Sequence, residues 1–157
     1  MTDIREQILL RILAILGGLP GIVTAARNRL ELSGTNRPAA ILHDGVEEES
    51  SQDSNAPPPR GSLKQFMSLQ PRIEILAGSA SDGIGATMSA FRAALLPAIL
   101  GDATLQQLCG GPSGVRGQTT MLYLGSTLET VGGATTEATM EFNFRFQYVL
   151  SIEDLAS

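Results

Sequence analysis

Apolar and polar residues alternate strictly over residues 140–148, and this is the cleanest pattern in the chain. A period of two places successive side chains on opposite faces of a β-strand. We therefore expect a strand over Ala138–Ser151 with one core face and one wet face. Three of the five phenylalanines lie on the core face, so a one-residue slip would expose them all and this strand should fix the register of its sheet. The predicted core residues are Met140, Phe142, Phe144, Phe146, Tyr148 and Leu150.

Isoleucine and leucine recur at helical spacing over residues 3–16, which predicts an amphipathic helix. Asp3 is the predicted N-cap, and Glu6, three residues later, completes a capping box. The segment 17–21 (GGLPG) should end this helix, because glycine accepts positive φ and proline cannot continue the hydrogen-bond ladder.

Two more helices are predicted in the middle of the chain. Asp82 could cap a helix running to about Leu100, with Pro97 expected to kink or end its last turn. Asp102 is the predicted N-cap of a short helix over 103–108.

Shorter apolar segments bounded by turn residues predict four further strands. The order of all the elements predicts an α+β fold, with a mixed β-sheet of about five strands and two or three helices packed on one face. The length of 157 residues favours a single domain over 1–157. The four strands are predicted at Ile22–Arg29, Pro38–Asp44, Ser68–Ala77 and Val115–Gly125.

The apolar pattern disappears between residues 45 and 64. Acidic residues come first, then serine and asparagine, and then three consecutive prolines at 57–59. Such a composition cannot bury enough apolar surface to offset the roughly 1–2 kcal/mol per residue that ordering costs. We expect a flexible acidic and proline-rich loop at about 45–64, mobile in the free subunit. It is either functional in an assembly or a tolerated insertion.

The net charge of −5 equals the charge of the segment 44–54, and the rest of the chain is balanced. Without a basic stripe, sequence-independent nucleic-acid binding has little support. Arginine outnumbers lysine by ten to one, which favours protein partners because arginine forms bidentate pairs at protein contacts. No apolar run is as long as a membrane span requires, so we expect no membrane partner.

Candidate catalytic and metal motifs all fail on detail. One cysteine and one histidine cannot build the usual zinc sites. Gly83-x-Gly85 has Met88 where a dinucleotide fingerprint needs a third glycine. The segment 111–115 (GPSGV) resembles a nucleophile elbow but lacks its final glycine. We expect no catalytic residues, no cofactor and no metal, and therefore no enzyme.

Two single residues could still carry chemistry. His43 lies beside Asp44, so an aspartate-oriented imidazole is conceivable as a general base, although a structural or surface histidine is the commoner case. Cys109 follows apolar residues near a predicted helix end, which favours a buried, unreactive role over a reactive thiol.

Arginines gather where two of the predicted strands meet. Positions 27 and 29 share one strand face, and 37 could lie close across the turn, so a cationic patch is possible. The acidic tract is long enough to reach a neighbouring copy, and head-to-tail complementarity between subunits is one interpretation. The alternative is ordinary solvated charge. The candidate contact residues for a subunit or tail tube are Arg27, Arg29, Arg37, Asp44, Glu47, Glu48, Glu49 and Asp53.

Four segments together resemble the tail terminator (tail completion, minor tail protein) family of long-tailed bacteriophages. They are the opening helix REQILLRILAILGGLPGI, the segment VTAARNRLELSGTNRPAAILHDG leading into EEE, the strand PRIEIL, and the final strand MEFNFRFQYVL. Each is a pattern of apolar spacing and none is a catalytic signature. Together they cover most of the chain.

The resemblance implies a small α+β subunit that assembles as a ring, commonly a hexamer, on the end of the tail tube. Such a ring stops tube polymerisation and faces the head connector or a head-closure protein. The implied partners are further copies, the tail tube protein and the connector. The implied location is the virion, and the host cytoplasm during assembly. The alternatives are another neck or head–tail adaptor ring, a component of a contractile secretion apparatus, and a small enzyme of unrecognised type.

Overall fold

Three helices and five strands make up the part of the chain that the computed structural model describes, which is residues 3–28, 38–49, 64–79, 83–110, 121–131 and 136–151. In chain order they are α1 (Ile4–Gly17), β1 (Thr24–Arg27), β2 (Ala39–Glu49), β3 (Lys64–Ser79), α2 (Ile84–Leu100), α3 (Ala103–Leu108), β4 (Met121–Val131) and β5 (Thr136–Ser151). No helix among these residues is long and apolar enough to cross a bilayer.

The strands form one mixed sheet in the order β1-β2-β3-β5-β4. β1 and β2 are parallel, whereas every other neighbouring pair is antiparallel. The longest ladder joins β3 and β5, from Lys64 opposite Ser151 to Ser79 opposite Thr136. The two strands with the clearest alternation in the sequence therefore lie at the centre of the sheet.

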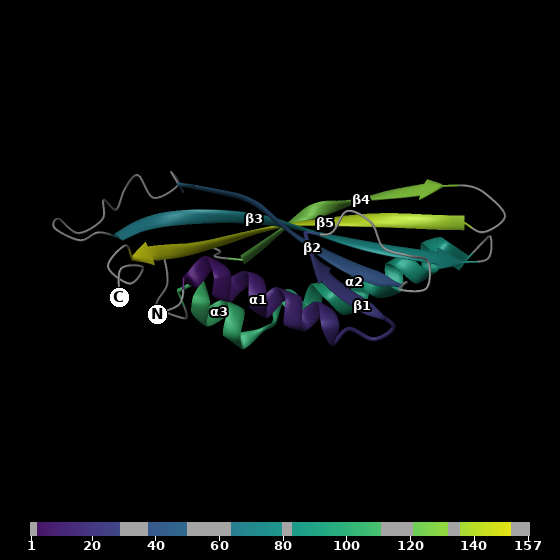
Figure 1. The fold of residues 1–157 in the computed structure, drawn as a ribbon, viewed down its shortest axis with the longest axis horizontal. Coiled ribbons are helices and arrows are strands. Elements are labelled where there is room, and N and C mark those ends of the chain that lie inside the picture. The colour runs from purple at the N-terminus through teal and green to yellow at the C-terminus, as the bar shows by residue number, and fades with distance from the viewer. Residues whose placement is uncertain are drawn as a thin grey trace.

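The helices cover one face of this sheet, as Figure 1 shows. α1 contacts β1 and β2, while α2 contacts β3, β5 and β4. The core lies between the two layers and is built from the inner face of the sheet and the apolar sides of α1 and α2. The α+β prediction, with a mixed five-stranded sheet and helices on one face, is confirmed.

β5 has the two faces that its sequence predicts. Phe142, Phe144 and Phe146 are completely buried, and Tyr148 is almost so. The opposite face is only partly wet, because Gln147 is buried there at 4% exposure. Strand alternation decides the direction of a side chain, whereas the neighbouring strands decide how much water reaches it.

The predicted helices form, with local differences at their ends. Asp3 caps α1 by accepting a hydrogen bond from the Arg5 backbone N–H at 3.0 Å. Glu6 does not complete a capping box, because both of its carboxylate oxygens accept hydrogen bonds from Arg27. The N-cap of α2 is Gly83, and Asp82, the predicted cap, lies outside the described residues.

The third helix is capped and tied down by one carboxylate. Asp102 accepts a hydrogen bond from the Leu105 backbone N–H at 2.9 Å, which confirms it as the N-cap. It also accepts two hydrogen bonds from the Arg11 guanidinium, at 2.7 and 3.0 Å. Because Arg11 lies on α1, this bidentate pair fixes α3 against α1.

Proline at 97 does not end α2, which continues to Leu100.

The strand boundaries differ from those predicted, most of all for β2 and β4. β2 continues to Glu49, so residues 45–49 of the expected loop are strand, and residues 50–63 lie outside the described part of the chain. The extension is possible because Gly45 forms a bulge that restarts the ladder with β3 at Val46. β4 continues to Val131 and does not end at Gly125 as predicted, and residues 115–120 of the predicted strand lie outside the described residues.

Candidate functional site

Arg27, the last residue of β1, is the centre of an ionic cluster at the start of α1. Its Nε and Nη2 donate to the two carboxylate oxygens of Asp44 on β2, at 2.7 and 2.8 Å. Its Nη1 and Nη2 donate to the two oxygens of Glu6 on α1, at 2.6 and 2.9 Å. One guanidinium therefore joins a helix to two parallel strands through two bidentate contacts.

Two neighbours extend this cluster. Arg5 lies 3.5 Å from the Asp44 carboxylate and 3.9 Å from that of Glu47. Asn28, directly after β1, has a left-handed backbone with φ of 54°, a conformation that asparagine tolerates. Its Oδ1 accepts a hydrogen bond from the Asp44 backbone N–H at 3.1 Å. The Arg27 cluster consists of Arg5, Glu6, Arg27, Asp44 and Glu47.

The electrostatics of the Arg27 cluster follow from these contacts. Hydrogen bonds from Arg27 lower the pKa of both Glu6 and Asp44, against the opposing effect of burial. The same contacts raise the pKa of Arg27. Burial raises the pKa of Glu47. The positive charge of Arg5 lowers this pKa, but by less than burial raises it. Arg27 is thus paired with two carboxylates of its own chain, and these contacts hold α1 against β1 and β2.

The cluster predicts a pH dependence of stability. Glu6 and Asp44 have lowered pKa values in the folded state, so their stabilisation is present above their ordinary pKa and is lost as pH falls through the folded-state pKa. We expect the free energy of unfolding to decrease below about pH 4, more in the wild type than in Arg27→Met. Arg27→Met should itself cost about 1–3 kcal/mol at neutral pH, because two carboxylates lose charged hydrogen bonds.

Urea unfolding of the wild type and Arg27→Met measures this difference. The pH is varied from about 3 to about 7, a range that includes the ordinary pKa values of aspartate and glutamate. Arg92→Met is the matched control, since Arg92 is exposed and its contact is with the Tyr123 ring and not with these carboxylates. Parallel pH profiles for the wild type and Arg27→Met would contradict the assignment.

The predicted contact residues fall into three groups. Arg27 and Asp44 come together in the Arg27 cluster, and Glu47 lies at its margin. Glu48 and Glu49 are exposed at the end of β2, where Glu48 accepts a 3.4 Å hydrogen bond from Gln70. The remaining predicted contacts, Arg29, Arg37 and Asp53, lie outside the described residues.

The histidine does not pair with its sequence neighbour. Asp44 is bound to Arg27, whereas the His43 Nε2 lies 3.8 Å from a Glu74 oxygen on β3. The hypothesis of an Asp44-oriented base at His43 is therefore wrong, because consecutive strand residues point to opposite faces, so that His43 faces the open side while Asp44 faces α1 and binds Arg27. Cys109 is fully buried, and burial raises the pKa of its thiol to about 12, as expected of an unreactive cysteine.

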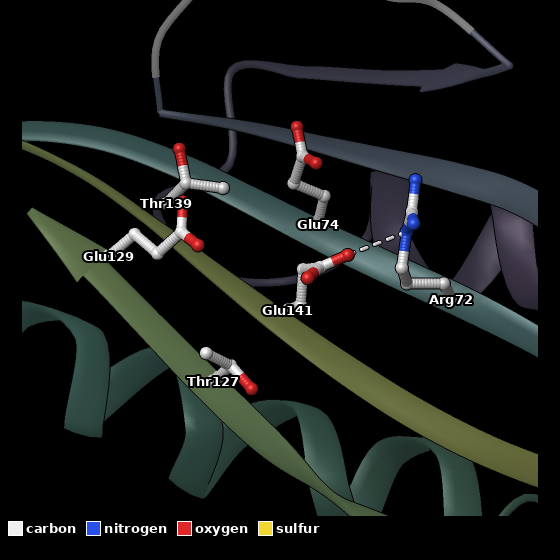
Figure 2. Close-up of a pocket in the computed structure, with 6 residues that line it drawn as sticks. All are labelled: Arg72, Glu74, Thr127, Glu129, Thr139 and Glu141. Atoms are coloured by element: carbon white, nitrogen blue, oxygen red, sulfur yellow. Dashed lines mark ion pairs between the residues drawn. The ribbon is translucent and has the colours of Figure 1, made fainter.

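A polar hollow of about 240 Å³ lies on the face of the sheet that the helices leave open. Its walls come from three adjacent strands, and Figure 2 shows the side chains standing on β3, β5 and β4. Arg72 Nε lies 2.7 Å from a Glu141 oxygen across the β3–β5 ladder. The lining residues are Arg72, Glu74, Thr127, Glu129, Thr139 and Glu141.

The hollow has the chemistry of a contact surface. Its three carboxylates and two hydroxyls can accept hydrogen bonds, but it contains no histidine, cysteine or serine. The described residues hold no group of three or more histidine, cysteine, aspartate or glutamate side chains that could bind a metal ion. The hollow was not predicted from the sequence, although Arg72 and Glu74 alternate there with apolar residues.

Comparison with known proteins does not indicate a function for the Arg27 cluster or for the hollow. No protein-family model matches the chain, and a search of curated proteins finds no match. Function is therefore inferred from the fold, from the two polar sites and from the resemblance of the sequence segments.

Proposed function

We propose that this chain is the subunit of a ring that caps the tail tube of a long-tailed bacteriophage, ends tube polymerisation and forms the interface to the head connector. The observation that supports it best is the arrangement of the sheet. Among the described residues, helices cover one face only, and on the other face Arg72, Thr127 and Glu129 around the hollow are exposed, as is the edge strand β4 at Leu124 and Leu128. A subunit that acts by assembly needs such surfaces.

The segments that carry the resemblance also build the centre of this fold. The opening segment forms α1 and its turn, the second segment supplies β1 and β2, and the other two lie in β3 and β5. They are therefore one packed unit and not scattered similarities. The tail terminator interpretation accounts for this unit and for an open sheet face whose hollow has the chemistry of a contact surface.

Capping of tail tubes by the purified protein tests the proposal. We expect the protein added to polymerising tail tube subunits to shorten the tubes as its concentration rises, because a bound ring blocks further addition. Electron microscopy should show ring-shaped density at one tube end. Tubes of unchanged length without end density, at every protein ratio, would contradict the proposal. Binding to head connectors without binding to tubes would favour the alternative of another neck adaptor.

A further inference from the structure

Besides the outer edge of the short end strand β1, two strand edges are left without a partner in the described sheet. β4 is the other end strand and pairs only with β5. β1 covers β2 only as far as Leu42, opposite Arg27, and the Asp44 backbone N–H donates to Asn28, so among the described residues the outer edge of residues 45–49 has no partner. An exposed edge presents unpaired backbone N–H and C=O groups and is a template for another strand.

The two edges differ in chemistry. β4 has no charged residue from 121 to 128, and Leu124 and Leu128 on it are 45% and 44% exposed. Beside residues 121–123, at the start of the strand, the charges are positive. Arg92 of α2 lies over the Tyr123 ring at 5.7 Å, and Arg145 of β5 stands opposite Leu122. Neither arginine forms an ion pair within the described part of the chain.

The bare edge of β2 has the opposite character. Val46 is 60% exposed there, and Glu48 and Glu49 beside it are exposed as well. Acidic edges prevent a strand from pairing with its own copy, because like charges directly opposite are destabilising. The same glutamates allow the β2 edge to pair with an uncharged strand that has arginines beside it.

We infer that β4 of one copy pairs with the outer edge of β2, residues 46–49, of a second copy. Three antiparallel steps separate β2 from β4, so the two strands run in opposite directions. A sheet continued from one copy to the next in the same orientation therefore joins them as an antiparallel ladder, which is the more stable kind. Arg145 would face Glu48 on the open side of this ladder. Arg92 would face Glu49 on the helix side.

This contact is heterologous, so its repetition closes a ring or extends a filament. Symmetric alternatives are disfavoured by charge. Two β2 edges would oppose their glutamates, and two β4 edges that overlap at residues 121–123 would bring the arginines of both copies together. The inference names the subunit contact of the proposed ring and rests on that proposed function for the existence of the assembly.

Cysteine cross-linking tests the contact, since the native Cys109 is buried and unreactive. Glu48 and Leu122 both point to the open face, and the pairing that sets Arg145 against Glu48 brings these two positions opposite each other. The variants Glu48→Cys and Leu122→Cys are purified separately, assembled on tail tubes alone or as a mixture, and treated with a short bis-maleimide. We expect a cross-linked dimer from the mixture only. A chain carrying both substitutions should give a ladder of oligomers.

Ala14→Cys, exposed on α1, replaces Leu122→Cys in the matched control mixture and should give no dimer. Thermal melting checks that each variant folds, and the pair Val46→Cys and Leu124→Cys, exposed on the same two edges and opposite each other in the same register, is used if either variant does not. Cross-linking within either single variant overturns the inference in favour of a symmetric contact. Rings on tubes without a mixed dimer overturn it while the proposed function stands. No assembly on tubes at all overturns both.

Discussion

Phe144→Asp should abolish folding, whereas Asn143→Asp should be tolerated. Phe144 is completely buried in the centre of β5, where its ring packs 5.5 Å from Tyr123 and 6.1 Å from Phe146, measured between ring centroids. An unpaired carboxylate in that position costs several kcal/mol, which approaches the whole stability of a domain, about 5–15 kcal/mol. The adjacent Asn143 is only half-buried and points to the open face.

Asn143→Asp is the matched control, because this substitution introduces the same charge into the same strand. The carboxylate introduced by Asn143→Asp would stand opposite Arg72 of β3, which is a favourable neighbour. Soluble yield, circular dichroism and melting temperature measure the outcome. We expect no folded Phe144→Asp protein and a near-wild-type Asn143→Asp protein. Equal yield and melting temperature for the two variants would show that the faces of β5 are assigned wrongly.

Gly45→Ala should be the most damaging removal of a single glycine. Gly45 has φ of 73°, in the left-handed region, and a Cβ there would overlap the backbone carbonyl of Gln70 on β3. The left-handed conformation costs an alanine roughly 1–2 kcal/mol, and the clash can be relieved only by moving the β2–β3 ladder. We expect a loss of about 3 kcal/mol or more in the free energy of unfolding.

Gly85→Ala is the control for this substitution. A Cβ at Gly85 meets nothing within 4 Å, and the residue lies in the first turn of α2. Alanine should therefore leave stability unchanged or raise it by about 0.5–1 kcal/mol. Urea unfolding of the three proteins decides the comparison. The bulge assignment is wrong if Gly45→Ala and Gly85→Ala unfold at the same urea concentration.

The ends of β2 and β4 show where sequence reasoning fails and why. Glu47, Glu48 and Glu49 have the composition of a solvated loop, yet they lie in a strand. Their backbones pair with Leu69, Ser68 and Met67 of β3. A strand that is exposed on both faces has no apolar alternation to detect. For β4, the segment 126–131 contains only scattered apolar residues, and its pairing with β5 supplies the order that its own sequence does not show.

The site residues divide in the same way. Arg27 and Asp44 were among the contacts predicted from the sequence, but nothing in the sequence indicated that they bind each other and Glu6. That geometry depends on the parallel pairing of β1 with β2, and on the bulge at Gly45. The hollow on the open face was equally hidden, because its residues come from three strands whose order along the sheet differs from their order in the chain.

Patterns along the chain were sufficient for the α+β class, the three helices, the buried face of β5 and the roles of Asp3 and Asp102 as caps. These features depend on contacts between residues near one another in the chain, or on a periodicity repeated over many residues. The strand order, the partners of Arg27, the face that the helices leave open and the contrast between the two bare edges emerged only in the folded chain. Each of these joins residues far apart in sequence, so its energy exists only once folding has brought the groups within range.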